Sequence, residues 1–257
     1  MVGEKFRFRF RKAGDLRLLS HHDLMRSAER LLRRADVPFK STGGFHPTPR
    51  LVFALSLPLG VVGLNEVVEL ELTCPHDADE LRARLNQHAP AGLTFSAAKV
   101  VEMAATAVPR RAVYRMPLPP GRCELLGPSV AGLLSADKVW ADRLRPKPRR
   151  VNVRPYIRDI TTTADAVELD LWVTSTGTAR ADELIQLLGL GDVLDSGAVP
   201  ERTDLEIHDE VPPGAADAPP AGPPETAPLE HVPADAADED GGRPAEWGLS
   251  PNGPVVE

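Results

Sequence analysis

The chain opens with strict alternation of apolar and basic side chains. Three phenylalanines alternate with three arginines, in the order Phe6, Arg7, Phe8, Arg9, Phe10, Arg11. Side chains along a β-strand point to opposite faces with a period of two, so the phenylalanines share one face. The pattern predicts a half-buried strand over residues 5–12. Its arginines fit a solvated face as well as a binding face.

The apolar period then changes to that of a helix. One stripe is formed by Leu24, Ala28, Leu31, Leu32 and Ala35. Ser20 and Asp23 have the spacing of a capping box, in which the hydroxyl accepts the N–H of the third helical residue. Pro38 disfavours helical geometry at the residue before it. We therefore expect an amphipathic helix that begins after Ser20 and ends near Asp36.

The remaining elements repeat one order. Strands are expected at 51–57 and 66–72, a helix at 78–88 and a strand at 93–101. A second series follows, with strands at 112–118, 151–160, 166–173 and 201–208 and helices at 123–137 and 181–188. Each series reads β-α-β-β-α-β, which is the ferredoxin-like order. The sequence predicts an α+β fold of two tandem ferredoxin-like units, 1–103 and 110–208.

Beyond residue 208 the composition changes. Residues 209–257 hold 11 acidic side chains and one basic, and proline, alanine and glycine replace the aliphatic residues. Such a segment buries too little apolar surface to offset chain entropy, so a disordered acidic tail is expected over 209–257. The tail accounts for the net charge of −7, because residues 1–208 hold 29 basic and 26 acidic side chains.

Other features of the composition exclude several classes. No stretch approaches the roughly 18 consecutive apolar residues of a membrane-spanning helix, and the N-terminus lacks the apolar segment of a secretory signal. Cys74 and Cys123 are the only cysteines, so no disulfide framework is expected. We expect a cytoplasmic protein that has no membrane partner.

Basic residues gather in two places. The first 50 residues hold 12 basic and five acidic side chains, and residues 143–158 hold seven basic and none acidic. The second block is proline-rich and continues into a predicted strand, which is typical of a surface that tracks single-stranded RNA. Its candidate contacts are Arg149, Arg150, Arg154 and Tyr156. The structural alternative is a solvated linker.

Two turns contain side chains that the turn structure itself does not require. The first is Ser20-His21-His22-Asp23, where helix capping explains Ser20 and Asp23 but not the histidines. The second is the loop over residues 42–50, in which Phe45 and His46 lie between glycines and prolines. Its spacing is not that of a phosphate-binding P-loop. We expect both turns to share one polar pocket and no metal, because the histidine spacing is poor for a metal site.

Several segments together suggest a family. They are residues 19–26 (LSHHDLMR), 44–51 (GFHPTPRL), 58–60, 151–157 and 178–184, with Glu66, Val68, Glu69, Arg202 and Thr203. Over residues 4–208 the chain resembles a bacterial domain of unknown function that accompanies B12-binding radical SAM proteins. Three positions depart from that family's pattern, namely His22, Thr42 and Thr48.

The resemblance implies a radical SAM protein as partner and RNA modification as the setting. An iron–sulfur cluster requires thiolate ligands, so the cluster, S-adenosylmethionine and cobalamin are expected only in the partner. Our leading hypothesis is a non-catalytic accessory protein that binds RNA, either transfer or ribosomal, and no DNA. The expected ligand-binding residues are Arg17, Ser20, His21, Asp23, Gly44, Phe45, His46 and Arg50, together with the second basic block.

Two alternatives remain open. One is a metal-independent ribonuclease with His21 or His46 as general base. The other is a module that only binds other proteins.

Overall fold

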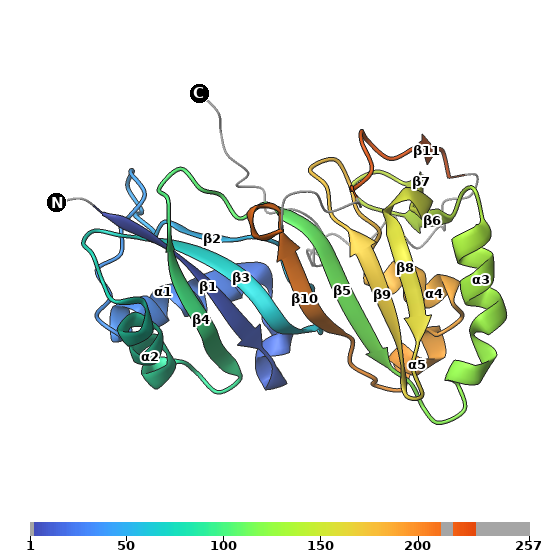
Figure 1. Ribbon diagram of the computed structural model, residues 1–257, viewed down its shortest axis with the longest axis horizontal. Coiled ribbons are helices and arrows are strands. Elements are labelled where there is room, and N and C mark those ends of the chain that lie inside the picture. Colours follow the sequence, from blue (N-terminus) through green and yellow to red (C-terminus); the bar gives the residue numbers. More distant parts are fainter. Residues whose placement is uncertain (1–2, 212–217, 230–257) are drawn as a thin grey trace. The chain divides into compact units, whose positions relative to one another are not determined.

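The computed structural model describes residues 3–211 and 218–229, and these residues form two compact units (Figure 1). Unit 1 contains residues 3–109 together with Glu201–Val211. Unit 2 contains Arg110–Pro200 together with residues 218–229. The structure confirms an α+β fold. The domain boundaries differ from the expected ones, because the predicted strand at 201–208 belongs to the first unit and not to the second.

Unit 1 keeps the expected order of elements. They are β1 (Glu4–Lys12), the 3-10 helix η1 (Gly14–Leu18), α1 (His21–Arg34), β2 (Leu51–Phe53), β3 (Val62–Leu72), α2 (Ala78–His88), β4 (Leu93–Val101), β10 (Glu201–Ile207) and the 3-10 helix η4 (His208–Glu210). The strands neighbour one another in the order β4-β1-β3, and both β2 and β10 pair with β3. β1 is antiparallel to β3 and β4, whereas β10 runs parallel to β3.

The phenylalanine face of β1 forms the core of unit 1, as its alternation predicts. Phe6, Phe8 and Phe10 are at most 2% exposed. They pack with the apolar stripes of both helices, so α1 and α2 cover the same face of the sheet. The rings of Phe8 and Phe95 meet edge to face at 5.6 Å, a favourable aromatic geometry.

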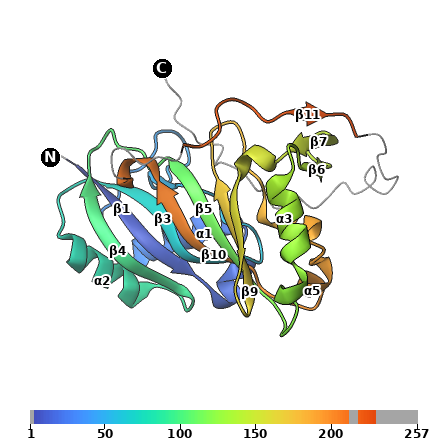
Figure 2. The same ribbon diagram turned by 45° about the vertical axis from the view of Figure 1, so that its right-hand side comes forward.

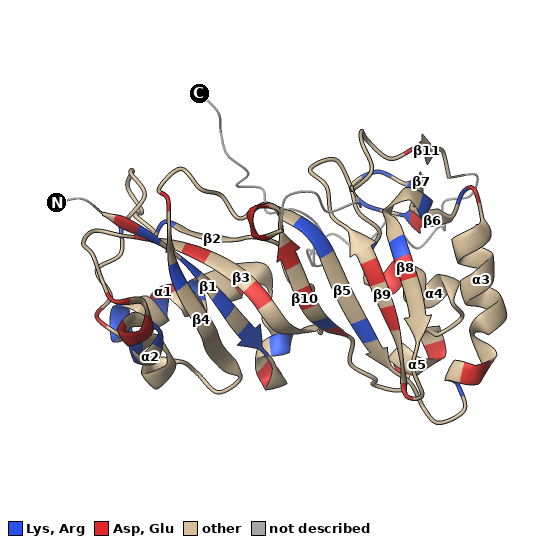
Figure 3. Ribbon diagram, in the orientation of Figure 1, with Lys and Arg blue, Asp and Glu red and all other residues tan. Residues whose placement is uncertain are grey.

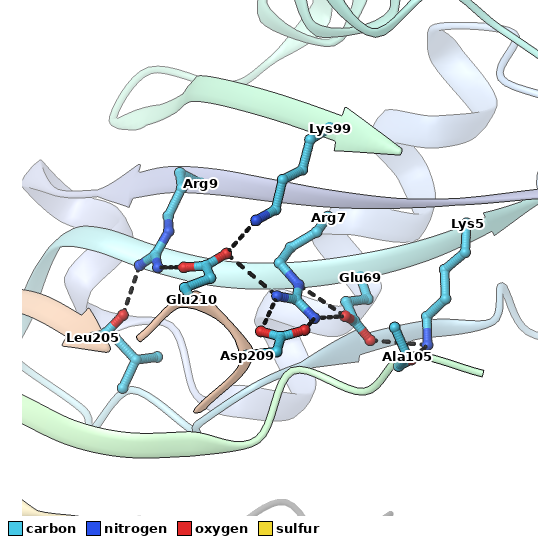
Figure 4. A network of polar contacts seen from close by, with 9 residues as sticks. All are labelled: Lys5, Arg7, Arg9, Glu69, Lys99, Ala105, Leu205, Asp209 and Glu210. Atoms are coloured by element: carbon cyan, nitrogen blue, oxygen red, sulfur yellow. Dashed lines mark hydrogen bonds and ion pairs between the residues drawn. The ribbon is translucent and has the colours of Figure 1, made fainter. Parts of the chain in front are cut away.

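The arginine face of β1 is covered at Arg7 and partly covered at Arg9, whereas Arg11 is exposed, so neither a solvated face nor an open binding face describes it. The Arg7 side chain is 1% exposed. Its guanidinium donates to Glu69 at 2.9 Å and to both carboxylate oxygens of Asp209 at 2.6 and 2.8 Å (Figure 4). Arg9 pairs with Glu210, which also binds Lys99 at 2.7 Å. The arginines therefore hold an acidic segment of the same chain.

We call Asp209 and Glu210 the acidic clasp. Both lie in η4, directly after β10, and their carboxylates cover the charged face of β1 (Figure 4). These residues were expected to begin a disordered tail. Arg7 and Arg9 of β1 and Lys99 of β4 supply the positive charge that these two carboxylates bind, which explains why they join the body of unit 1 instead.

Unit 2 is organised around two small sheets. Its elements are β5 (Pro109–Pro117), η2 (Cys123–Leu125), α3 (Gly127–Ser135), β6 (Trp140–Arg143), β7 (Arg149–Asn152), η3 (Arg154–Tyr156), β8 (Ile157–Thr162), β9 (Ala166–Trp172), α4 (Ala181–Leu187), α5 (Gly191–Asp195) and β11 (Thr226–Ala227). One sheet has the order β5-β9-β8 and the other β11-β7-β6. All of these pairs are antiparallel.

Two sequence predictions for unit 2 need correction. The strand expected over 151–160 is divided into β7 and β8 by η3, where Pro155 lies at the start of a helical turn. The second correction concerns the expected tail, because residues 218–229 lie on unit 2. β11 pairs with β7, and Lys138 binds Glu225 at 2.6 Å (Figure 2). The rest of the expected tail, 212–217 and 230–257, lies outside the described residues.

Membrane insertion through a helix finds no support in the described ranges. None of the helices there combines the length and the apolar character that crossing a bilayer requires.

Candidate functional site

The turn before α1 is a helix cap, as predicted. Ser20 is the N-cap residue, and its Oγ accepts the backbone N–H of Asp23 at 3.2 Å. The Ser20 hydroxyl in turn donates to the Asp23 carboxylate at 2.7 Å. In the expected capping box the carboxylate would bind the backbone of Ser20, whereas here it accepts from the side chain. Both residues thus have a structural role that accounts for their spacing.

His21 belongs to a partly buried cluster beside this cap. Its ring lies 5.7 Å from the ring of Phe53 and 6.0 Å from that of His22. Burial lowers the pKa of His21, and the charges of His22 and Lys12 lower it further. The imidazole is therefore neutral near pH 7.

Lys12 lies at the end of β1 and is completely buried. Its Nζ donates to the carbonyl of Leu19 at 2.9 Å, which fixes the chain just before the helix cap. Burial lowers the pKa of Lys12 to about 8, although the nearby Glu66 carboxylate opposes that shift. Lys12 falls in the even-numbered series that the phenylalanines of β1 occupy, so a cation in the apolar series was the available signal for a buried role.

A buried ion pair lies next to Lys12. Arg202 of β10 donates to both carboxylate oxygens of Glu66 on β3, one of them at 2.7 Å. It also donates to the carbonyls of Leu55 and Ser56 at 3.1 and 3.2 Å. Both side chains are at most 2% exposed. This pairing gives the physical reason why β10 joins unit 1.

The loop over residues 41–50 is the most exposed polar feature of unit 1, and we call it the finger loop. Thr42 and Thr48 close it, with the backbone N–H of Thr42 donating to Thr48 O at 2.8 Å and the two hydroxyls 3.2 Å apart. Gly44 has a φ of 108°, which favours glycine. Phe45 is fully exposed at 102%, and residues 41–48 are all exposed.

Basic residues lie at the base of the finger loop. Lys40 and Arg50 both form ion pairs with Glu71, at 3.0 and 3.4 Å, and their side chains remain 43% and 46% exposed. The loop therefore combines an exposed aromatic ring and an imidazole with two cations and one carboxylate. Arg17 is not part of it, since its guanidinium folds back onto the carbonyl of Gly14 at 3.1 Å.

The described structure does not bring the two turns together. Phe53, which contacts His21, pairs with Val68 of β3, whereas the base of the finger loop bonds to Glu71. Val68 and Glu71 are three residues apart, which is about 10 Å along a strand. The finger loop extends past the carboxyl end of β3, beside the start of β1, whereas α1 follows the carboxyl end of β1 (Figure 1). Within the described residues, no contact supports the expected shared pocket of His21 and His46.

Unit 2 presents the second basic block as a hairpin between β6 and β7. Residues 144–149 are all exposed. Within the described chain, the side chains of Arg145, Lys147 and Arg149 form neither hydrogen bonds nor ion pairs. Arg150 differs from them, because it pairs with Asp142 at 3.1 Å and lies 5.9 Å from the Trp140 ring. The loop of the β6–β7 hairpin, with the first residue of β7, thus presents three exposed cations without ion-pair partners in the described chain, while the strands also carry paired charges of both signs (Figure 3).

The structure corrects the roles of the other two residues predicted in this block. Tyr156 is 1% exposed. Its hydroxyl would lie 2.7 Å from a Cβ at Gly177, so the phenol packs closely beneath that glycine and is not a stacking surface. Arg154 donates to the carbonyls of Ile157 and Leu134 at 3.0 and 2.5 Å and so ties η3 to α3. Both residues therefore have structural roles within unit 2.

Comparison with known proteins places this chain in a bacterial family. Residues 5–182 match the family described as an uncharacterized protein conserved in bacteria (DUF2344), and the chain belongs to that family. No curated protein matches the sequence. A crystal structure of an unknown protein from Galdieria sulphuraria is similar at 10% identity and a TM-score of 0.24, covering 80% of this chain and 99% of that one. A similarity that weak carries no argument about fold or function.

Proposed function

We propose that this protein is a non-catalytic RNA-binding accessory protein. The observation that carries the proposal is the β6–β7 hairpin, where Arg145, Lys147 and Arg149 are exposed and without partners in the described chain. By contrast, the buried Arg7 and Arg202 are paired with carboxylates. Exposed cations without a carboxylate partner are available to the anions that a phosphate backbone supplies along its length.

The finger loop supports the same proposal from unit 1. An exposed ring on a proline-stiffened loop can stack on an unpaired base, because every base has a π-face. Lys40 and Arg50 at the base of the loop are about half exposed and can approach a backbone phosphate. This arrangement favours single-stranded RNA, whose bases are free to stack, over a duplex.

The partner is proposed from the resemblance to domains that accompany B12-binding radical SAM proteins. We propose that this protein binds RNA and that the partner binds the iron–sulfur cluster, S-adenosylmethionine and cobalamin. Cys74 and Cys123 of this chain lie in different units, one half-buried and one buried, and are too few for a cluster. Modification of transfer or ribosomal RNA is the proposed setting, and the cytoplasm the proposed location.

Replacing the three hairpin cations tests the electrostatic part of the proposal. The variant Arg145→Ala, Lys147→Ala, Arg149→Ala should bind single-stranded RNA more weakly, and its log–log salt slope should flatten by about two units, at about 0.7 per lost phosphate contact. Fluorescence anisotropy over a salt series measures both. The matched control is Arg26→Ala, Arg30→Ala, Arg33→Ala on the exposed face of α1. Equal loss in both triple variants, or no RNA binding by the wild-type chain at low salt, would contradict the proposal.

Replacing Phe45 tests the aromatic part. Phe45→Ala should weaken binding of single-stranded RNA by about 1–3 kcal/mol, the usual contribution of one stacked base, while Phe45→Trp should retain it. Leu125→Ala is the control, because Leu125 is also exposed, at 69%. Unchanged RNA affinity in Phe45→Ala would show that the finger loop does not stack on RNA.

A further inference from the structure

Two arginines of unit 2 contact a single carboxylate, and a third lies on the neighbouring strand. Glu183, in the first turn of α4, accepts from Arg143 at 2.6 and 3.0 Å. The backbone N–H of Arg180 donates to the same carboxylate at 3.0 Å, and the Arg180 guanidinium lies at 3.8 Å. Arg149 is the cross-strand partner of Arg143 in the β6–β7 hairpin. We call Arg143, Arg149 and Arg180 the arginine cluster.

The positive charge of this cluster exceeds the negative charge that faces it. Arg143 is satisfied, since it also donates to the carbonyl of Thr178 at 2.8 Å. Arg180 is not, and burial lowers its pKa, as do the charges of Arg143 and Arg149, while Glu183 and Asp182 oppose the shift. Burial and the Glu183 charge raise the pKa of Asp182, which weakens it as a counterion. An added anion would relieve this imbalance.

Unsatisfied polar atoms mark the same place. The Nε of Arg180 is buried and has no hydrogen-bond partner within the described chain, and the same holds for Oδ1 of Asp182. A buried donor without an acceptor is rare in native proteins. Because protein atoms cover this Nε, a ligand would have to bind through the terminal nitrogens of the guanidinium. The Arg180 side chain is 26% exposed, so a ligand can approach its exposed part from solvent.

The chemistry of the cluster selects the class of ligand. A guanidinium binds the oxygens of a phosphate through two parallel N–H bonds, which a lysine cannot reproduce. Exposed Arg145 and Lys147 follow in the same hairpin, so the positive charge continues beyond the cluster as a chain of phosphates would require. Glu183, held by Arg143, fixes the backbone of Arg180 and so orients its side chain.

We propose that Arg149 and Arg180 bind a phosphate group of the RNA backbone, with Arg143 and Glu183 positioning Arg180. This inference rests on the RNA-binding function proposed above and adds a defined phosphate site to it. Free phosphate offers the same chemistry, so the experiment separates the two sources.

The test uses the full chain and the variants Arg180→Gln and Arg149→Gln. Arg122→Gln is the matched control, because Arg122 is a partly exposed arginine of unit 2 that pairs with Asp192 at 2.9 Å. Each cluster variant should weaken binding of a short single-stranded RNA at least threefold and flatten its log–log salt slope by about 0.7. The NMR signal of the Arg180 Nε–H group should shift on adding RNA. The control should leave affinity and slope unchanged.

The outcomes distinguish this site from the wider proposal. If wild-type protein binds RNA but both cluster variants bind equally well and the Nε–H signal is unmoved, the phosphate site is wrong and the RNA-binding function stands. If wild-type protein binds no RNA, the RNA-binding function is wrong, and titration with inorganic phosphate decides the site. A shift of the Arg180 signal at millimolar phosphate then supports an anion site for free phosphate, and no shift overturns it. If Arg180→Gln fails to fold, the shift of the Arg180 Nε–H signal in the wild-type chain decides the site, because loss of Arg149 is also expected to weaken RNA binding under the wider proposal.

Discussion

Arg202→Ala should destabilise the protein by about 3–5 kcal/mol, because it leaves the Glu66 carboxylate buried without its partner. The pair is at most 2% exposed on either side, so water cannot replace the lost guanidinium. The variant also leaves the carbonyls of Leu55 and Ser56 without a donor. Chemical denaturation followed by circular dichroism gives the free energy of unfolding.

A second variant separates loss of the charge pair from loss of packing. Arg202→Met with Glu66→Leu removes both charges and should recover much of the lost stability, since apolar replacement of a buried pair is often neutral. Arg26→Ala is the control, because that side chain is 72% exposed and should change stability little. If Arg202→Ala proved no more destabilising than Arg26→Ala, the pair would not anchor β10.

Neutralising the acidic clasp should give the second large effect. Asp209→Asn with Glu210→Gln should cost about 1–3 kcal/mol, because hydrogen bonds to charged groups are lost from Arg7, Arg9 and Lys99. The loss is smaller than for Arg202, since Arg7 keeps Glu69 and Asp209 is 48% exposed. Asp15→Asn serves as control, because that carboxylate is fully exposed.

The clasp also predicts a pH dependence with a definite sign. The pKa of Glu210 is lowered to about 2 through its bonds to Lys99 and Arg9, which outweigh burial, and Arg7 lowers the pKa of Asp209. A carboxyl whose folded pKa is lowered stabilises the fold fully above its unfolded pKa, so this contribution is complete above about pH 5. The stability gap between wild type and the clasp variant should therefore narrow as the pH falls from 5 toward 2. A gap independent of pH would show that the carboxylates do not act through their charge.

Local patterns were enough to predict most of unit 1. The alternation of Phe6, Phe8 and Phe10 identified the buried face, and Ser20 marked the start of α1, because both signals depend on neighbours within a few residues. The partner of β10 was not predictable in this way. Glu66 and Arg202 are 136 positions apart, and a seven-residue strand carries no local signal for the sheet that it joins.

The candidate sites were predicted in part, for a similar reason. Charge density identified the block at residues 143–158, but it could not separate exposed Arg149 from Arg154, whose side chain binds backbone carbonyls. Tyr156 resembled a stacking residue because burial depends on the close approach of Gly177, which only the fold reveals. The proposed role of Arg180 has no local sequence signal, since it depends on the charges of two arginines more than 30 residues away in the chain.

The position of β10 in the chain has a consequence for synthesis. Unit 1 begins at the N-terminus, yet Arg202 and the acidic clasp leave the ribosome only after the whole segment Arg110–Pro200 of unit 2. At about 5–20 residues per second, those roughly 100 residues take about 5–20 s. During that interval Glu66 and Arg7 lack their distant partners, and the edge of β3 that receives β10 is open. The nascent chain must therefore pass through a stage in which residues 1–109 are made but unit 1 cannot complete its fold. During that stage a chaperone or the binding partner has access to the open edge of β3.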